Sequence, residues 1–147
     1  MTIELAAKDV ARLTNDHIPE AVVSYTETDL LVKLEHLGAV AKFLKDASGL
    51  DFSFLIGITA VDYVEYFELI YHLRSMKLNQ SVVLKTRVFG RDEPIVPSLI
   101  ELWPGADLQE REIWDLMGIK FDAHPNLKRI LLWEGFSGHP LRKDYLG

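Results

Sequence analysis

The chain has 147 residues, a formal net charge of −6 and no cysteine. A single domain is expected, since one hydrophobic core usually forms from roughly 100–200 residues. Without thiols the chain forms no disulfide, binds neither zinc nor an iron–sulfur cluster through cysteine, and performs no thiol catalysis. The negative charge argues against a nucleic-acid-binding protein, which normally has a basic surface.

The sequence shows no sign of a membrane or export segment. No apolar run approaches the roughly 20 residues that span a bilayer. The first residues include Glu4, Asp9 and Asp16 and lack the apolar stretch of a signal peptide. We therefore expect a soluble protein that begins in the compartment where it is made.

The first third predicts two helices and a hairpin. Apolar residues at helical spacing predict a helix before Pro19, namely Ile3, Ala7, Val10 and Leu13. Two short strands over residues 21–25 and 30–34, joined by polar residues 27–29, predict a hairpin. A second helix is expected from Leu37 to Leu44, with Gly49 near its end.

The middle of the chain is rich in predicted strands. Residues 52–61 are almost wholly apolar, which predicts a central strand buried on both faces. Residues 66–75 and 82–89 alternate between apolar and polar, so each is expected to have one covered face. Short turns at 62–65 and 77–80 make these strands consecutive. The pattern predicts an α+β fold: a mainly antiparallel sheet of four or more strands with helices packed on it.

The last third changes character. Ser98 and Glu101 are spaced like a capping pair, which predicts a short helix before Pro104. Asp107 is expected to cap a helix over residues 108–117 that Gly118 ends. Residues 119–147 show little periodicity. We therefore divide one domain into an α+β core, residues 1–105, and a helix with an extended irregular tail, residues 106–147.

The tail combines neutral charge with apolar residues. Residues 108–147 hold six acidic and six basic residues, so residues 1–107 carry the whole charge of −6. Residues 130–133, with Phe136 and Tyr145 nearby, form either a buried edge strand or a contact strip for a partner. The partner is favoured, because a long irregular segment must satisfy its backbone polar groups somewhere. The tail of the free chain is then expected to show fast hydrogen exchange or to be ordered only by another copy.

Three carboxylates lie on the predicted third helix: Glu110, Glu112 and Asp115. Glu112 and Asp115 share a helix face, so the group suits general acid–base catalysis or a Mg²⁺ or Ca²⁺ site. The alternative is structural, since Arg111 and Asp115 are four residues apart and acids near a helix start are stabilised by its dipole. We favour structure or docking.

Other motifs for chemistry are weak. His124 and His139 each precede a proline, but zinc needs three or four ligands, so a backbone hydrogen bond from each imidazole is the preferred interpretation. Neither a GxGxxG nor a Walker phosphate loop is present, and no serine elbow occurs. The motifs do not decide about flavin, and nothing argues for it.

Two blocks in the last third carry a specific pattern. The first is EREIWDLMGI at residues 110–119, followed by Phe121 and HPNLKRIL at residues 124–131; the second is GHPLRKDY at residues 138–145. In this order they closely resemble the 30 kDa-type subunit, or C subunit, of the proton-pumping NADH–quinone oxidoreductase, respiratory complex I. The resemblance is looser upstream. Ala123 stands where that family usually has glycine, and Trp114 occupies a variable position.

The resemblance implies a structural subunit of the hydrophilic peripheral arm. A protein of this kind docks against the quinone-side D subunit and the iron–sulfur B and I subunits, and contacts the membrane arm only indirectly. It is peripheral and held by other subunits at the cytoplasmic side of a prokaryotic plasma membrane. Flavin, iron–sulfur clusters and quinone are then bound by partner subunits, and the complex transfers electrons from NADH to quinone coupled to proton pumping.

For this chain the resemblance implies no catalytic residue, no cofactor and no metal of its own, and no nucleic-acid partner. It implies that the two blocks form a docking signature, and that truncating its charges impairs assembly. The signature comprises Glu110, Arg111, Glu112, Asp115, Gly118, Phe121, His124, Pro125, Lys128, Arg129, Gly138, His139, Pro140, Arg142, Lys143, Asp144 and Tyr145.

Three alternatives remain. The first is the equivalent subunit of a related membrane-bound complex with another donor, linked to ferredoxin, deazaflavin or hydrogenase. The second is an independent soluble enzyme that uses the three helix carboxylates. The third is a nucleic-acid-binding module with Lys85, Arg87, Lys128 and Arg129 as its contacts.

Overall fold

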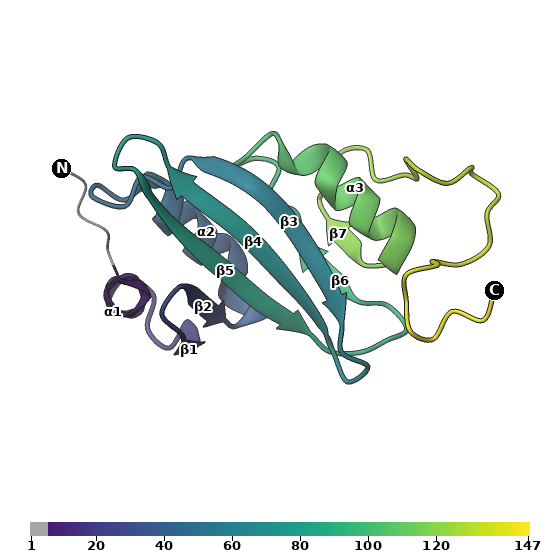
Figure 1. Ribbon diagram of the computed structural model, residues 1–147, viewed down its shortest axis with the longest axis horizontal. Coiled ribbons are helices and arrows are strands. Elements are labelled where there is room, and N and C mark those ends of the chain that lie inside the picture. Colours follow the sequence, from purple (N-terminus) through teal and green to yellow (C-terminus); the bar gives the residue numbers. More distant parts are fainter. Residues whose placement is uncertain (1–5) are drawn as a thin grey trace.

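Five strands form the main sheet of the computed structural model, which describes residues 6–147 (Figure 1). Their spatial order is β1-β2-β5-β4-β3. The strands are β1 (Val22–Tyr25), β2 (Asp29–Val32), β3 (Phe54–Asp62), β4 (Phe67–Ser75) and β5 (Gln80–Val88). Two short strands, β6 (Ile95–Pro97) and β7 (Lys120–Asp122), pair in parallel as a second sheet.

In the described residues, three α-helices accompany the sheets. They are α1 (Ala7–His17), α2 (Leu37–Asp46) and α3 (Ala106–Met117), with a 3₁₀ turn, η1 (Leu34–His36), directly before α2. The predicted α+β fold with a mainly antiparallel sheet is confirmed. The predicted first helix is present from Ala7, and Ile3 lies outside the described residues. No helix within residues 6–147 is both long and apolar enough to cross a membrane.

The strand connections explain one feature that the sequence did not predict. The β1–β2 hairpin and the β3–β4–β5 meander are antiparallel, as expected, but β2 pairs with β5 in parallel. Because α2 lies between β2 and β3 in the sequence, the chain crosses the sheet before the meander begins. A pattern of local strands cannot show which distant strand becomes a neighbour.

One hydrophobic core covers one face of the sheet. The predicted alternation of β4 is confirmed, since Phe67, Leu69, Tyr71 and Leu73 are all fully buried. The expected apolar face of α2 packs on them, and residues of α1 and α3 belong to the same core. Trp103, just before α3, donates its indole N–H to the carbonyl of Phe52 at 3.2 Å. The third helix is therefore fixed to the sheet before the tail begins.

The prediction that residues 52–61 form a central strand buried on both faces is wrong. This strand, β3, lies at an edge of the sheet, and Phe54 and Ile56 are exposed. An apolar run normally indicates a strand buried on both faces, but here α3 covers only part of it. Gln109 of α3 accepts a hydrogen bond at 2.7 Å from the free N–H of Ile58, which protects this edge.

Two capping predictions are also wrong. No helix forms between Ser98 and Glu101, although the Ser98 hydroxyl accepts the backbone N–H of Ile100 at 3.2 Å; the same hydroxyl donates to Glu110 at 2.5 Å. Helix α3 begins at Ala106 with Gly105 as its N-cap, so Asp107 lies in the first turn and does not cap it. The expected helix end is confirmed: Gly118 adopts a left-handed φ of 73°, a conformation that favours glycine.

The core contains one unpaired hydroxyl. Tyr71 is fully buried, and its hydroxyl has no hydrogen-bond partner in the described part of the chain. Burial of this group raises the pKa of Tyr71. Because an unpaired buried hydroxyl is destabilising, Tyr71→Phe should increase the free energy of unfolding by about 1 kcal/mol.

Chemical denaturation of the two proteins tests this prediction. The neighbouring variant Leu73→Ala is the control, and it should lose about 2–5 kcal/mol because it creates a cavity. If Tyr71→Phe loses more than about 1 kcal/mol, the hydroxyl has a partner and the prediction fails.

Candidate functional site

The tail, residues 119–147, extends beyond α3 at the end of the molecule opposite α1 (Figure 1). After β7 it has no regular secondary structure, as predicted. Its path is nevertheless held by hydrogen bonds to this chain. Leu141, for example, donates its backbone N–H to the carbonyl of Leu116 on α3 at 2.9 Å. The tail therefore lies largely on its own helix, whereas the expectation that it lies at least in part on a partner stays a prediction.

Asp115 is the centre of one set of contacts. Its side chain is completely buried on α3. One carboxylate oxygen accepts backbone N–H groups from three successive tail residues, at 3.2, 2.7 and 2.9 Å; they are Ile130, Leu131 and Leu132. The other oxygen accepts Nη1 of Arg129 at 2.7 Å. One carboxylate thus fixes four consecutive residues of an irregular segment.

Arg129 extends this set to the next part of the tail. Its Nη2 donates to the carbonyls of Phe136 and Gly138, at 2.9 and 2.8 Å. The loop between residues 129 and 138 is therefore closed around one guanidinium. The predicted Arg111–Asp115 pair is wrong, because Arg111 donates to the carbonyls of Lys128 and Arg129, each at 3.3 Å. Helical spacing could not predict these contacts, because the partners of Arg111 lie in the tail.

These bonds determine the protonation of Asp115. Its burial by itself would raise the pKa, because a low-dielectric environment disfavours charge. The hydrogen bonds from Arg129 and from the three backbone N–H groups outweigh that effect and lower the pKa to about 2. Asp115 is therefore a charged structural group at neutral pH.

Both signature histidines make backbone contacts, which is the arrangement preferred from the sequence. His139 Nδ1 lies 2.9 Å from the carbonyl oxygen of Asp115, and its ring packs on Gly118, where a Cβ atom would come within 2.7 Å. His124 Nδ1 accepts the backbone N–H of Asn126 at 3.0 Å. Within residues 6–147, no group of three or more histidines and carboxylates is arranged to hold a metal ion.

The turn before His124 contains a residue in a strained conformation. Ala123 has a φ of 66°, in the left-handed region. Glycine occupies this region without steric cost, whereas alanine does not. The glycine that the resemblance led us to expect here would fit this backbone, and this chain adopts the turn with a strained residue.

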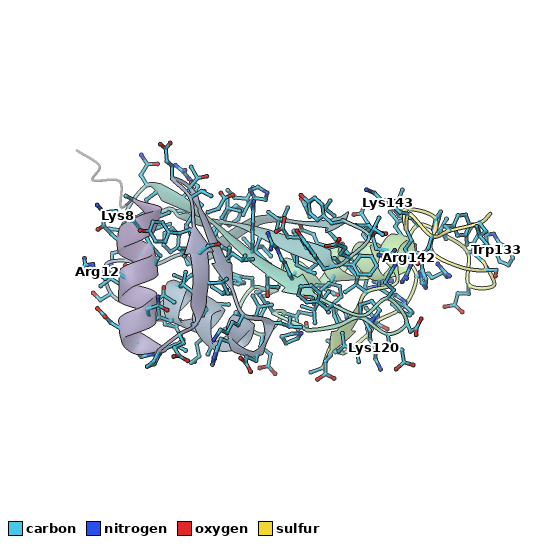
Figure 2. The ribbon with its side chains drawn as sticks, turned by 90° about the horizontal axis from the view of Figure 1, so that it is seen from below. Lys8, Arg12, Lys120, Trp133, Arg142 and Lys143 are labelled. Carbon is cyan, nitrogen blue, oxygen red and sulfur yellow. The ribbon has the colours of Figure 1, made fainter. Side chains whose placement is uncertain are left out.

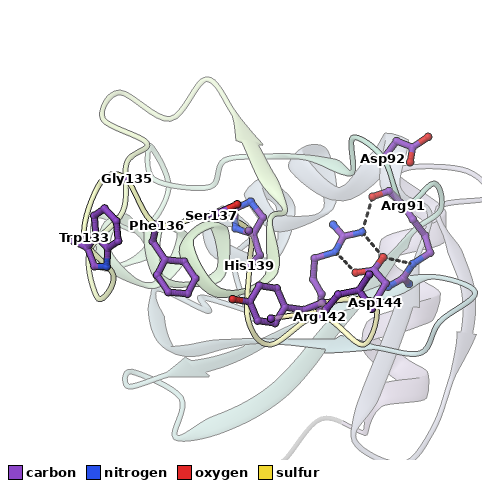
Figure 3. Close-up of a pocket in the computed structure, with 13 residues that line it drawn as sticks. Arg91, Asp92, Trp133, Gly135, Phe136, Ser137, His139, Arg142 and Asp144 are labelled. Carbon is purple, nitrogen blue, oxygen red and sulfur yellow. Dashed lines mark hydrogen bonds and ion pairs between the residues drawn. The ribbon is translucent and has the colours of Figure 1, made fainter.

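A second set of contacts holds the end of the tail, and we call it the Arg91 cluster: Asp62, Arg91, Arg142 and Asp144. Arg91 forms a double hydrogen bond with Asp62, at 2.8 and 2.7 Å, and contacts Asp144 at 3.1 Å. Arg142 donates to Asp144 and to the carbonyl of Arg91, the latter at 2.7 Å (Figure 3). Three distant chain segments meet here: the β3–β4 turn, the β5–β6 link and the tail.

Two members of this cluster were not predicted from the sequence. Asp62 was assigned to a turn, and Arg91 lies in a link with no motif. Asp62 is buried and also accepts the backbone N–H of Lys143 at 2.9 Å. Hydrogen bonds from Arg91 lower the pKa of Asp62 against the opposing effect of burial, and the guanidinium of Arg142 lowers the pKa of Asp144.

Large apolar side chains of the tail point outward. The strand interpretation of residues 130–133 is wrong, since these residues form no strand and are not buried; Leu131 is 61% exposed and Trp133 is 70% exposed. Trp133 lies at the tip of the molecule, far from Lys8 and Arg12 of α1 (Figure 2). With Phe136 it borders a hollow of about 830 Å³ whose other wall includes Arg91 and Arg142 (Figure 3).

The remaining signature residues range from buried to exposed. Glu110 and Phe121 are buried, while the ring of the half-buried Tyr145 packs on Gly138. Pro125 is exposed and Pro140 is half-buried. Three exposed charged side chains form no ion pair within the described residues: Glu112, Lys128 and Lys143.

The three helix carboxylates do not form one reactive site. Glu110 is completely buried and accepts hydrogen bonds from Ser98 and from the backbone of Leu99; burial raises its pKa against these bonds. Asp115 faces the tail, and Glu112 faces solvent. General acid–base catalysis needs two groups that reach one substrate. The arrangement instead suits a shaped surface for contact with other proteins.

Comparisons with known proteins agree with this arrangement. Residues 30–147 match the family model described as the respiratory-chain NADH dehydrogenase 30 kDa subunit. The C subunit of NADH-quinone oxidoreductase from Ruegeria sp. (strain TM1040) is 41% identical over 95% of this chain and 72% of its own length. Its counterpart from Moorella thermoacetica is 48% identical over 79% of this chain and 78% of its own length. The chain belongs to the 30 kDa subunit family of respiratory NADH dehydrogenases.

A solved structure shares the fold. A chain from the membrane-bound sulfane sulfur reductase, an archaeal respiratory membrane complex, is similar with a TM-score of 0.73 and 26% identity. The similarity covers 95% of this chain and 85% of that chain. The resemblance to the 30 kDa-type subunit that the sequence suggested is therefore confirmed.

Removing the charge of Asp115 tests the tail contacts. Asp115→Asn keeps the shape but leaves Arg129 without its buried partner, so the free energy of unfolding should fall by about 3 kcal/mol. Denaturation of Glu112→Gln, on the same helix but exposed, is the matched control and should change by about 0.5 kcal/mol or less. Equal effects of the two substitutions would contradict a structural role for Asp115.

The same carboxylate predicts a dependence on pH. The pKa of Asp115 is lowered from 3.8 to about 2, so its stabilising effect is complete above about pH 4 and is lost as the pH falls toward 2. The difference in unfolding free energy between wild type and Asp115→Asn should be constant near pH 7 and shrink below about pH 4. Denaturation curves across this range measure it, and an unchanged difference at about pH 2.5 would refute the assignment.

Proposed function

We propose that this chain is a structural docking subunit in the hydrophilic arm of a proton-translocating NADH–quinone oxidoreductase, complex I. The docking surface consists of α3 and the tail. One observation carries the proposal: successive backbone N–H groups of the tail donate to Asp115 within this chain, while the tail presents Leu131, Trp133 and Leu141 to solvent. The chain itself contributes contacts and shape, and not chemistry.

Exposed apolar side chains are the first support. Soluble proteins rarely display large contiguous apolar surfaces unless these surfaces bind something. Tryptophan is enriched among the residues that dominate binding energy, and Trp133 is the most protruding labelled residue of the tail (Figure 2). A surface of this kind fits another protein of the same assembly.

Preorganisation is the second support. A flexible tail would lose conformational freedom on binding, which weakens affinity. Here Arg129 and the Arg91 cluster fix the tail before any partner arrives. The signature charges therefore have two roles: those bound within the chain shape the surface, while Glu112, Lys128 and Lys143 are free to contact a partner.

The family supplies the partners in this proposal. The quinone-side D subunit and the iron–sulfur B and I subunits are the proposed neighbours, with the membrane arm reached only through them. Clusters are assigned to partner subunits because this chain has no cysteine to hold one. Flavin and quinone are assigned to partner subunits on the basis of the family. The proposed location is peripheral, at the cytoplasmic side of a prokaryotic plasma membrane.

A second candidate is the equivalent subunit of a related complex with another electron donor. The similarity to a chain of the membrane-bound sulfane sulfur reductase favours this possibility. Both candidates use the same surface. Purification of the intact complex from native membranes separates them, because a flavin-containing NADH-oxidising module should be present in the first and missing from the second.

Variants of the exposed residues test the proposal. Trp133→Ala, Glu112→Ala and Arg142→Ala should each reduce the amount of assembled complex, the last because it also releases Asp144. Met76→Ala is the control, since Met76 is 66% exposed but lies at the β4–β5 turn. Native gels measure assembly, and quinone reductase activity of the same membranes measures turnover.

The ratio of quinone reductase activity to assembled complex distinguishes a docking role from a catalytic role. Activity per assembled complex should change less than about twofold, because no group of this chain touches the reactants. The amount of assembled complex should change far more: a loss of about 2 kcal/mol in binding free energy would lower the bound fraction of this subunit about thirtyfold at limiting concentration. Normal assembly with activity per complex reduced by orders of magnitude would mean that these residues are catalytic. Normal assembly and activity in all three variants would refute the docking surface.

A further inference from the structure

The turn between β3 and β4 contains a backbone conformation that its sequence does not favour. Val64 has a φ of 72°, in the left-handed region. For a β-branched residue this conformation is a genuine outlier, and it persists only where the surrounding structure fixes it. The side chain of Val64 is 54% exposed, so the packing of that side chain does not fix the conformation. The restraint therefore acts through the two peptide groups of this residue.

The Arg91 cluster binds both peptide groups of Val64. The N–H of Val64 donates to Oδ1 of Asp62 at 2.8 Å, and its carbonyl accepts Nη1 of Arg91, also at 2.8 Å. Asp62 and Arg91 are joined to each other by their double hydrogen bond, at 2.8 and 2.7 Å. One ion pair therefore holds the N–H and the carbonyl of the strained residue.

The position of Arg91 depends in turn on the tail. Arg91 lies in the link between β5 and β6, where the chain forms neither helix nor strand. Its carbonyl accepts Nη2 of Arg142 at 2.7 Å, and its Nε lies 3.1 Å from Asp144 (Figure 3). The N–H of Lys143 donates to Asp62, the other member of the ion pair, at 2.9 Å. Three consecutive tail residues thus complete the cluster that restrains the turn.

We propose that the Arg91 cluster couples the tail to the β3–β4 turn: the docked tail holds Val64 in its left-handed conformation, and release of residues 142–144 lets the turn relax. This coupling is a property of the chain by itself and does not depend on the proposed function. Because coupling between two sites is reciprocal, a change that relieves the strain at Val64 also strengthens docking of the tail. The turn and the end of the tail then form one two-state element.

Relaxation of the turn changes a row of exposed rings. Tyr63 is 47% exposed, and its ring centroid lies 5.3 Å from that of Tyr66, which lies 5.4 Å from that of Phe89. Phe89 is 68% exposed and lies two residues before Arg91. Since Tyr63 adjoins Val64, a partner that displaces the tail also alters this aromatic surface. The cluster thereby gives the tail an effect beyond its own contacts.

Amide hydrogen exchange of the isolated full chain tests the coupling from the side of the tail. Asp144→Asn removes the charge that the tail supplies to Arg91, so the amide of Val64 should exchange at least about fivefold faster than in the wild type. Asp92→Asn is the matched control, since Asp92 is exposed, follows Arg91 in sequence and forms no ion pair within residues 6–147. This control should leave the Val64 amide unchanged.

The backbone of Val64 reports the relaxation directly. A left-handed φ brings the amide and α protons of one residue close together, which gives a strong nuclear Overhauser effect between them. This signal should be strong in the wild type and in Asp92→Asn, and weaker in Asp144→Asn. A weak signal in the wild type would contradict the inference.

Val64→Gly tests the coupling from the side of the turn. Glycine adopts a left-handed φ without steric cost, so the amide of Lys143 should exchange at least about fivefold more slowly than in the wild type. Glu20→Gly is the matched control, because Glu20 also has a left-handed φ, of 65°, but lies in the turn between α1 and β1, at the other end of the molecule from the tail (Figure 1). It should leave the Lys143 amide unchanged.

Three exchange results would overturn the inference. In Asp144→Asn, one is a Val64 amide at the wild-type rate although the Lys143 amide exchanges faster, since tail and turn would then open separately. Another is an equal acceleration of the β4 amides, which would show a global loss of stability. The third is a Lys143 amide that Val64→Gly slows no more than Glu20→Gly does. If Asp144→Asn fails to fold, this third comparison still decides, because Val64→Gly removes none of the contacts of the cluster.

Discussion

The buried carboxylate of Asp115 is the interaction on which the rest of the tail depends. A charge without solvent contact is costly unless it is paired and hydrogen-bonded. Asp115 obtains its partners from Arg129 and from three successive backbone N–H groups, all in the tail. Those donors in turn lack a helix or strand to satisfy them. Helix α3 and the tail therefore stabilise one another, and an irregular segment acquires a defined shape.

This arrangement gives most charges of the motif a partner within the chain. Asp115 and Arg129 neutralise each other, as do Asp62 and Arg91, so these charges serve to fix the backbone. Apolar side chains that would normally fill a core are then left on the outside, with Trp133 at the tip. The result is a rigid apolar surface, which suits permanent association with other subunits of a respiratory complex.

Local features of the fold were predictable and long-range pairings were not. The alternation of Phe67, Leu69, Tyr71 and Leu73 predicted the buried face of β4, and Gly118 marked the end of α3. The parallel β2–β5 pair, the edge position of β3 and the partner of Arg111 depend on residues far apart in sequence. Arg91 left no local signal, because its role comes only from three segments that meet around it. The signature predicted the family, but not which of its charges face inward.

The central claim is that the chain forms this surface without help from a partner. Amide hydrogen exchange of the isolated wild-type chain, in a sample verified as monomeric, tests it most directly. The amides of residues 130–132 should be protected nearly as well as those of β4, because all three donate to Asp115. Exchange of these amides at the rate of an unstructured peptide would show that the tail is ordered only by its partners and would contradict the account.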